Sequence, residues 1–105
     1  MQQISSVNNA TIKKLAKLNQ KKYRDDEGSY LIEGFHLFEE AIKAGKKYQY
    51  ILGTEEALDK VNEDYNLELD GKNVILINKA IARHLSSTKN SQEIFMVLKI
   101  DQPRE

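Results

Sequence analysis

Residues 74–77 read Val-Ile-Leu-Ile, and this unbroken apolar run constrains the fold more than any other stretch of the chain. A short continuous run rich in β-branched residues is typical of a strand in a sheet that is covered on both faces. Helices must then pack on each side of that sheet. The run therefore predicts an α/β protein rather than an open, one-sided sheet.

Three further short runs have strand composition and are bounded by turn residues: 29–32, 48–52 and 94–100. Helical spacing fills the segments between them. Strands that alternate with helices favour parallel pairing, with helices on both faces. The last connection is short, so the final strand could run in either direction. The sequence predicts a three-layer α/β/α sandwich around a four-stranded sheet.

The first helix is predicted from its cap and its apolar spacing. Asn8 or Asn9 can cap it, since a short side-chain oxygen accepts a hydrogen bond from a free backbone N–H. The apolar stripe comprises Ile12, Leu15, Ala16, and Leu18 or Asn19. Residues 25–28, Asp-Asp-Glu-Gly, are expected to form a turn that stops the helix.

Three later helices carry start or stop signals of the same kind. Residues 35–44 end at Gly45, and residues 54–65 open with the capping oxygen of Thr54. Residues 78–85 are capped by Asn78. A turn is expected at residues 70–72, and a polar loop at residues 86–91.

The charges are segregated along the chain although the formal net charge is zero. Residues 1–24 hold six basic residues and no acidic one, a charge of +6, and residues 25–105 carry −6. A local basic segment of this kind is typical of a protein that binds a polyanion. A solvated helix face that only keeps the protein soluble is the alternative, and charge alone does not separate the two.

Length and composition limit the remaining classes. At 105 residues the chain is one domain, and it has no cysteine, so disulfides and thiolate metal sites are excluded. No apolar run approaches the ~20 residues that span a bilayer, and the first residues lack an export signal. We therefore expect a cytoplasmic protein with no membrane contact. Residues 101–105, with Pro103, have the composition of a linker.

Two sequence patterns resemble a known family. The first is I-x-S-x-x-N-x-x-I-K-x-L-x-K-L, from Ile4 to Leu18, followed by Lys-Lys-Tyr-Arg at residues 21–24. The second is G-x-Y-L-I-E-G-x-x-L-x-x-E-A, from Gly28 to Ala41. Both resemble the N-terminal RNA substrate-binding domain of the SpoU (TrmH-type) RNA 2′-O-ribose methyltransferases, and residues 85–92 are similar to the family's loop before the last strand.

The resemblance implies a fold similar to that of kink-binding ribosomal proteins, with a mixed sheet. It also implies that residues 1–100 form an RNA-binding domain, and that residues 101–105 begin a linker to a C-terminal methyltransferase domain. That second domain would bind S-adenosylmethionine, and this chain would hold no cofactor. The implied partners are structured RNA, ribosomal in kind, the methyltransferase domain of the same parent protein, and a second copy of that parent as a homodimer.

The functional interpretation of the basic segment is contact with phosphates, because lysines position RNA without distinguishing its sequence. The candidates are Lys13, Lys14, Lys17, Lys21, Lys22 and Arg24. Arginine can clamp a phosphate with two N–H groups, or Arg24 could instead pair with Asp25 or Asp26. Tyr23 could stack on an unpaired base, although packing against the sheet edge is favoured.

The second group of candidates flanks residues 33–34 and the loop 86–91. Gly34 would let the backbone approach an anion at a helix N-terminus. Glu33 is expected in a supporting role, as an acceptor for nearby N–H groups or as a partner of Arg24. Thr88, Lys89 and Asn90, next to Ser87, suit sugar and phosphate contacts, with ordinary loop composition as the alternative.

No catalytic or metal-binding constellation is predicted. His36 and His84 fall on predicted helices without a metal-ligand pattern. The leading hypothesis is a non-catalytic RNA-recognition domain of an S-adenosylmethionine-dependent rRNA ribose methyltransferase. The alternatives are a stand-alone structured-RNA-binding protein and a protein-interaction or dimerisation module.

Overall fold

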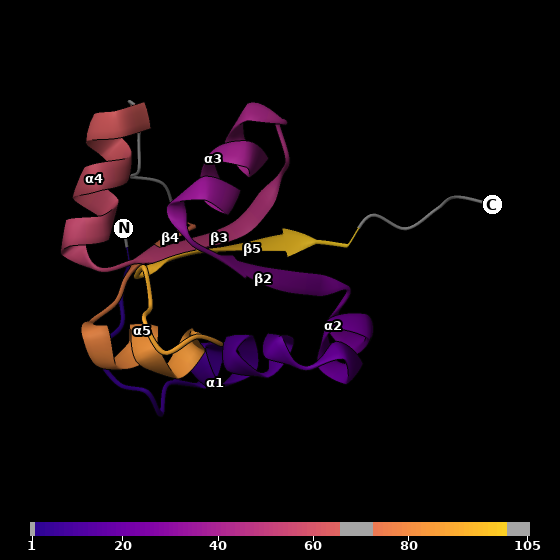
Figure 1. Ribbon diagram of the computed structural model, residues 1–105. Coiled ribbons are helices and arrows are strands. Elements are labelled where there is room, and N and C mark those ends of the chain that lie inside the picture. Colours follow the sequence, from indigo (N-terminus) through magenta and orange to yellow (C-terminus); the bar gives the residue numbers. More distant parts are fainter. Residues whose placement is uncertain (1, 66–72, 101–105) are drawn as a thin grey trace.

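A mixed five-stranded sheet forms the centre of the computed structural model, which describes residues 2–65 and 73–100 (Figure 1). The strands are β1 (Gln2–Gln3), β2 (Ser29–Glu33), β3 (Tyr48–Gly53), β4 (Val74–Leu76) and β5 (Ile94–Lys99), in the order β1-β4-β3-β5-β2. Strands β1, β4 and β3 pair in parallel, and β5 is antiparallel to both β3 and β2. The final strand thus takes the antiparallel direction.

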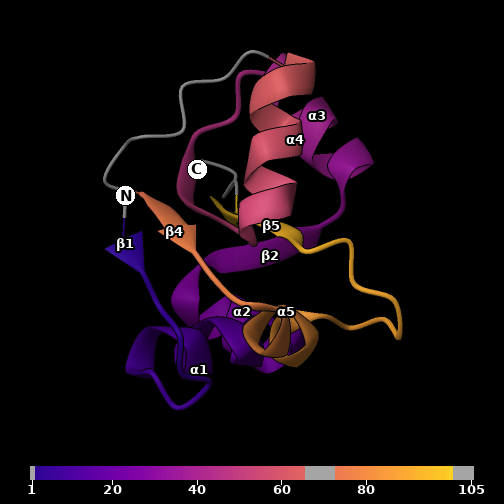
Figure 2. The ribbon, with the colours of Figure 1, turned by 90° about the vertical axis from the view of Figure 1, so that its left-hand side faces the viewer.

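Helices cover both faces of this sheet, as predicted (Figure 2). One face carries α1 (Ala10–Ala16), the 3-10 turn η1 (Lys17–Asn19), α2 (Lys21–Glu27) and α5 (Lys79–Leu85), which we call the α1–α5 layer. The other face carries α3 (Phe35–Lys43) and α4 (Glu55–Tyr65), the α3–α4 layer. The predicted three-layer α/β/α sandwich is confirmed. The predicted number of four strands was wrong, because the short edge strand β1 is polar and exposed and has no apolar pattern. No helix in the described part of the chain combines the length and apolar character needed to cross a bilayer.

The core is divided between the two faces by the alternation of side chains along each strand. Ile75 of β4 is fully buried in the cluster beneath the α1–α5 layer, together with Ile12 and Leu85. Val74, one residue earlier, packs into the cluster beneath the α3–α4 layer, which includes Phe38. The apolar run that predicted a sheet covered on both faces is buried on both faces.

The basic segment is two short helices rather than one long helix. The Asn9 side chain caps α1, accepting hydrogen bonds from the backbone N–H groups of Thr11 at 2.8 Å and Ile12 at 3.3 Å. After η1, Gln20 has extended backbone angles, with φ −106° and ψ 132°, and α2 begins at the next residue. Lysines before and after Gln20 therefore do not share one helix face.

The prediction that residues 25–28 form a turn was wrong. Asp25, Asp26 and Glu27 are the last turn of α2, and only Gly28, with φ +65°, ends the helix. Glycine adopts this left-handed conformation without the steric penalty of a side chain. Asp25 lies one helical turn after Lys21 and pairs with it, so the acidic residues are compatible with the helix.

The other predicted caps are confirmed. Thr54 Oγ1 accepts a hydrogen bond from the Ala57 N–H at 3.3 Å, and Asn78 Oδ1 accepts one from the Ile81 N–H at 2.9 Å. Helix α3 ends at Lys43, shortly before Gly45 with its φ of +67°. The turn predicted at residues 70–72 and the linker at residues 101–105 lie outside the described residues.

Candidate nucleic-acid interface

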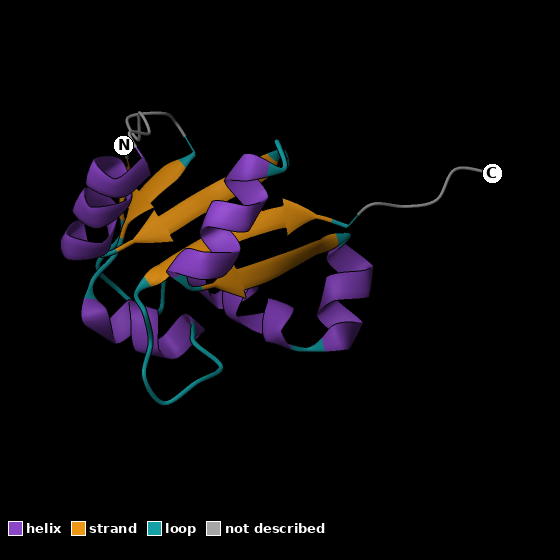
Figure 3. Ribbon diagram, turned by 45° about the horizontal axis from the view of Figure 1, so that its top comes forward, coloured by secondary structure: helices purple, strands orange, loops and turns teal. Residues whose placement is uncertain are grey.

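Glu33 joins the end of β2 to the loop between α5 and β5, which projects from the sheet (Figure 3). The Ser86 hydroxyl donates to the Glu33 carboxylate, with its oxygen 2.7 and 2.9 Å from the two carboxylate oxygens. The backbone N–H of Gln92 donates to the same carboxylate at 3.2 Å. One carboxylate thus holds both ends of residues 86–92, which we call the recognition loop.

Gly34 is buried and is the residue before α3, with a φ of +110°. The Gln92 side chain packs against Gly34, with its Oε1 3.1 Å from the position that a Cβ on Gly34 would occupy. The same Oε1 accepts a hydrogen bond from the N–H of Phe35, the first residue of α3, at 2.9 Å. The close approach predicted at Gly34 is therefore made by Gln92. An RNA contact at Gly34 stays a prediction.

The recognition loop is ordered by its own hydrogen bonds and presents free side chains. The Thr88 N–H donates to Ser86 Oγ at 3.1 Å, and Thr88 Oγ1 donates to the Asn90 carbonyl at 3.3 Å. Within the described ranges, the side chains of Ser87, Lys89 and Asn90 are exposed and form no hydrogen bond or ion pair. These groups are available to a ligand.

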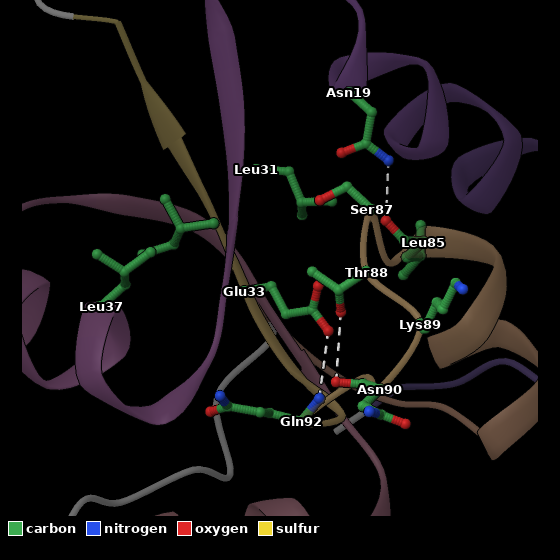
Figure 4. Close-up of a pocket in the computed structure, with 11 residues that line it drawn as sticks. Asn19, Leu31, Glu33, Leu37, Leu85, Ser87, Thr88, Lys89, Asn90 and Gln92 are labelled. Carbon is green, nitrogen blue, oxygen red and sulfur yellow. Dashed lines mark hydrogen bonds between the residues drawn. The ribbon is translucent and has the colours of Figure 1, made fainter.

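An open hollow of about 540 Å³ lies between β2, the start of α3 and the recognition loop (Figure 4). Its apolar lining consists of Leu31, Ile32, Leu37 and Leu85. Leu37 is the large apolar side chain that is exposed in the described structure, at 44%. Its polar lining includes Asn19, whose side-chain amide donates to the Leu85 carbonyl at 2.9 Å. Apolar surface beside free amide, hydroxyl and ammonium groups can accept an unpaired base and its phosphate.

Two of the predicted lysines are paired with acids and three are not. Lys14 Nζ lies 3.2 Å from Glu27, and Lys21 Nζ lies 2.8 Å from Asp25. Among the described residues, no ion pair is formed by the exposed side chains of Lys13, Lys17 and Lys22. The basic segment of the sequence is therefore partly neutralised by the acids that follow it.

Tyr23 and Arg24 organise the junction between the two short helices. The ammonium groups of Lys17 and Lys22 lie 5.3 and 5.9 Å from the centre of the Tyr23 ring, a cation–π arrangement. The half-buried Arg24 donates from Nη1 to the Leu18 carbonyl at 3.1 Å. The alternative in which Arg24 pairs with Asp25, Asp26 or Glu33 is not seen among the ion pairs of the described residues. Phosphate contact by the remaining guanidinium N–H groups stays a prediction.

Two further cations, Lys79 and Arg83 of α5, were not predicted as site residues from the sequence. Both are exposed, and both line a hollow of about 290 Å³ with Lys89. The sequence signal that could have found them is a second acid-free stretch, residues 73–92, which holds these three cations. His84 is exposed on the same helix, and His36 Nε2 lies 3.1 Å from Glu40. The described residues include no cluster of His, Asp and Glu able to hold a metal ion.

In three dimensions the charge separates by layer. The helices of the α1–α5 layer hold eight basic and three acidic residues, and the recognition loop adds Lys89. The helices of the α3–α4 layer hold seven acidic and two basic residues. The free polar side chains of the recognition loop lie beside the basic layer, so one face of the domain combines positive charge with hydrogen-bonding groups.

The fold and this face define the class of protein: an α/β/α domain with one basic face that carries exposed hydrogen-bonding groups. The chain belongs to the MRM3-like substrate binding domain family, whose model matches residues 9–96. The resemblance to the SpoU (TrmH-type) RNA ribose methyltransferases is thereby confirmed.

Individual proteins agree with this assignment. A tRNA/rRNA methyltransferase of Synechocystis sp., itself uncharacterized, is 31% identical over 94% of this chain. The crystal structure of an RNA 2′-O ribose methyltransferase superposes with a TM-score of 0.81 at 27% identity, over 97% of this chain. The AdoMet-bound rRNA methyltransferase of Sinorhizobium meliloti has the same fold, with a TM-score of 0.75 at 22% identity over 97% of this chain.

The chain accounts for only part of each of these proteins. It covers 36% of the Synechocystis protein, 39% of the ribose methyltransferase structure and 38% of the Sinorhizobium meliloti structure. About a third of a relative's length therefore corresponds to the domain described here.

Proposed function

We propose that this chain is the RNA-recognition domain of a cytoplasmic rRNA 2′-O-ribose methyltransferase, and that it does no chemistry by itself. It would hold structured RNA on the face formed by the α1–α5 layer and the recognition loop. A separate domain of the same protein would bind S-adenosylmethionine and transfer the methyl group. The cofactor would be held by that separate domain and by no residue of this chain. The intact enzyme would act as a homodimer.

The main support for this proposal is that Glu33 holds the recognition loop beside the basic α1–α5 layer. The Glu33 and Gln92 hydrogen bonds position the loop, while the side chains of Lys89 and Asn90 stay free. Lysines contribute affinity for any RNA backbone, and free amide and hydroxyl groups beside apolar surface favour unpaired nucleotides. Together they suit an RNA with a structured stem and exposed bases.

A salt titration tests the proposal. Fluorescence anisotropy would follow this chain binding to labelled fragments of structured ribosomal RNA, with a plain duplex for comparison. Four to six phosphate contacts should give log K against log salt a slope of roughly −3 to −5. The duplex should bind more weakly, because it offers no unpaired base to the hollow.

The informative variant is Lys13→Glu/Lys17→Glu/Lys22→Glu, because these three side chains are exposed and form no ion pair within the described structure. Its free energy of unfolding should fall by no more than about 2 kcal/mol, because the variant loses two exposed cation–π contacts with Tyr23, while RNA affinity falls.

The matched control is Lys46→Glu/Lys47→Glu/Lys60→Glu. It makes the same charge change at exposed positions outside the α1–α5 layer. Equal loss of affinity in both variants would reduce the effect to net charge. No RNA binding by the wild-type chain at low salt would refute the proposal and favour a protein-interaction module.

A further inference from the structure

The three cations of α5 and the recognition loop gather around one hollow. Lys79 and Arg83 are four residues apart on α5, and Lys89 reaches the same hollow of about 290 Å³ from the loop. Asn90, Ser91 and Glu93 complete its lining. We call Lys79, Arg83 and Lys89 the α5 cation cluster. It is separate in sequence from the lysines of α1 and α2.

The cluster lacks the acidic partners that Lys21 and Lys43 have. Lys21 and Lys43 each pair with an acid one helical turn away, at 2.8 and 2.7 Å. No ion pair involves the cluster within residues 2–65 and 73–100. The acid that faces the hollow, Glu93, is half buried and accepts a hydrogen bond from Thr54 Oγ1 at 2.8 Å. The hollow therefore keeps a net positive charge.

Helix stability does not explain the cation at the start of α5. Lys79 is the first residue of α5, where the helix dipole disfavours a cation. Arg83 lies one turn later on the same helix face, and like charges at this spacing repel. Arg83 also lies in the last turn of α5, where the dipole favours a cation, so only Lys79 works against the helix dipole. A negatively charged ligand between the two side chains would offset their mutual repulsion.

We propose that the α5 cation cluster binds backbone phosphates of the RNA strand that enters the recognition-loop hollow. Arginine can hold a phosphate with two parallel N–H groups, while each lysine supplies a point charge. Lys89 lines both hollows, so the cluster begins where the base-accepting hollow ends. The RNA strand would then pass over Lys79 and Arg83 of α5, and it would contact more of the domain than the lysines of α1 and α2. This inference rests on the proposed function, and it extends the binding face.

The test compares two triple variants of this chain by salt titration. The probes are a labelled single-stranded uridine 20-mer and the ribosomal RNA fragment that binds most tightly. Lys79→Glu/Arg83→Glu/Lys89→Glu removes three phosphate contacts, so the slope of log K against log salt should become less steep by about 2 to 3. The Lys46→Glu/Lys47→Glu/Lys60→Glu control should keep the wild-type slope. Folding is checked by thermal unfolding, and Lys79→Glu places a favourable charge at the start of α5.

A conservative change gives a second readout. Arg83→Lys keeps the charge but loses the two-pronged contact. The slope should stay at the wild-type value while affinity falls about three- to tenfold. A side chain that only solvates the helix surface would change neither quantity.

The outcomes separate this inference from the proposed function. If the cluster variant keeps the wild-type slope while Lys13→Glu/Lys17→Glu/Lys22→Glu loses it, the cluster is not a phosphate site, although the domain still binds RNA. If the cluster variant binds RNA like wild type and loses only self-association of the domain at low salt, the cluster contacts the acidic α3–α4 layer of a second copy. The inference is then refuted. If wild type binds neither probe, both proposals fail.

Discussion

Replacing Glu33 by alanine should loosen the recognition loop and lower the stability of the whole domain. The carboxylate accepts hydrogen bonds from two groups, the Ser86 hydroxyl and the Gln92 N–H. A hydrogen bond to a charged group contributes about 1.5 to 3 kcal/mol when it is well protected. Glu33 is only half buried, and both donors can reach water after the substitution, so we take about 1 kcal/mol for each. The free energy of unfolding should fall by about 2 kcal/mol.

Thermal unfolding would detect that loss as a decrease in Tm of roughly 8 °C for a domain of this size. Hydrogen exchange would locate it, because the amides of Thr88 and Gln92 should exchange faster while the β3 amides, in the middle of the sheet, change in proportion to global stability alone. Glu33→Gln keeps one acceptor oxygen and should lose about half as much stability. RNA affinity should fall with loop order in both variants.

The matched control is Glu63→Ala, which removes an exposed carboxylate from α4 and should change stability by less than about 0.5 kcal/mol. The reasoning would be refuted by a Glu33→Ala variant with the Tm of the control and unchanged loop exchange. In that case Glu33 would not hold the loop. Any effect on RNA binding would then come from the carboxylate itself.

The backbone and capping roles lead to two further predictions. Gly34→Ala should lower the free energy of unfolding in urea by about 2 to 4 kcal/mol, because it strains a φ of +110° and pushes against Gln92, which lies 3.1 Å from the new Cβ. The control Gly45→Ala, at φ +67° with no atom within 4 Å of the new Cβ, should lower it by only about 1 to 2 kcal/mol. Equal losses in the two variants would argue against the close contact at Gly34. Asn9→Ala should lower the free energy of unfolding by about 1 kcal/mol through loss of the α1 cap, whereas Asn8→Ala should lower it by less than about 0.5 kcal/mol. A larger loss for Asn8→Ala than for Asn9→Ala would show that the cap is misassigned.

Four strands and the layer architecture could be predicted because burial on both faces leaves a sequence pattern. The fifth strand could not. Gln2 and Gln3 are polar and exposed, and they join the sheet only through backbone pairing with Ile75 and Leu76. Backbone pairing at an edge requires no particular side chain, so β1 has no apolar alternation to reveal it.

The surface was harder to predict than the core, since charge pairing depends on contacts between segments. Counting charges along the chain indicated a strongly basic N-terminal segment. The acids that follow fold back within α2, where Glu27 reaches Lys14 of α1. The role of Glu33 as an acceptor for a nearby N–H was predicted correctly. Its partner Gln92 lies 59 residues away in sequence, which no local pattern specifies.

The opposite charging of the two helix layers would affect how the domain meets the proposed RNA ligand before any contact forms. With a net charge of zero, the molecule as a whole is neither pulled toward nor pushed away from a distant polyanion. Its two faces feel opposite forces, so an RNA nearby exerts a torque. The domain would rotate during diffusion until the α1–α5 layer faces the RNA. Encounters would therefore begin in an orientation close to the bound one, and this advantage should fade once salt shortens the screening length below the thickness of the domain.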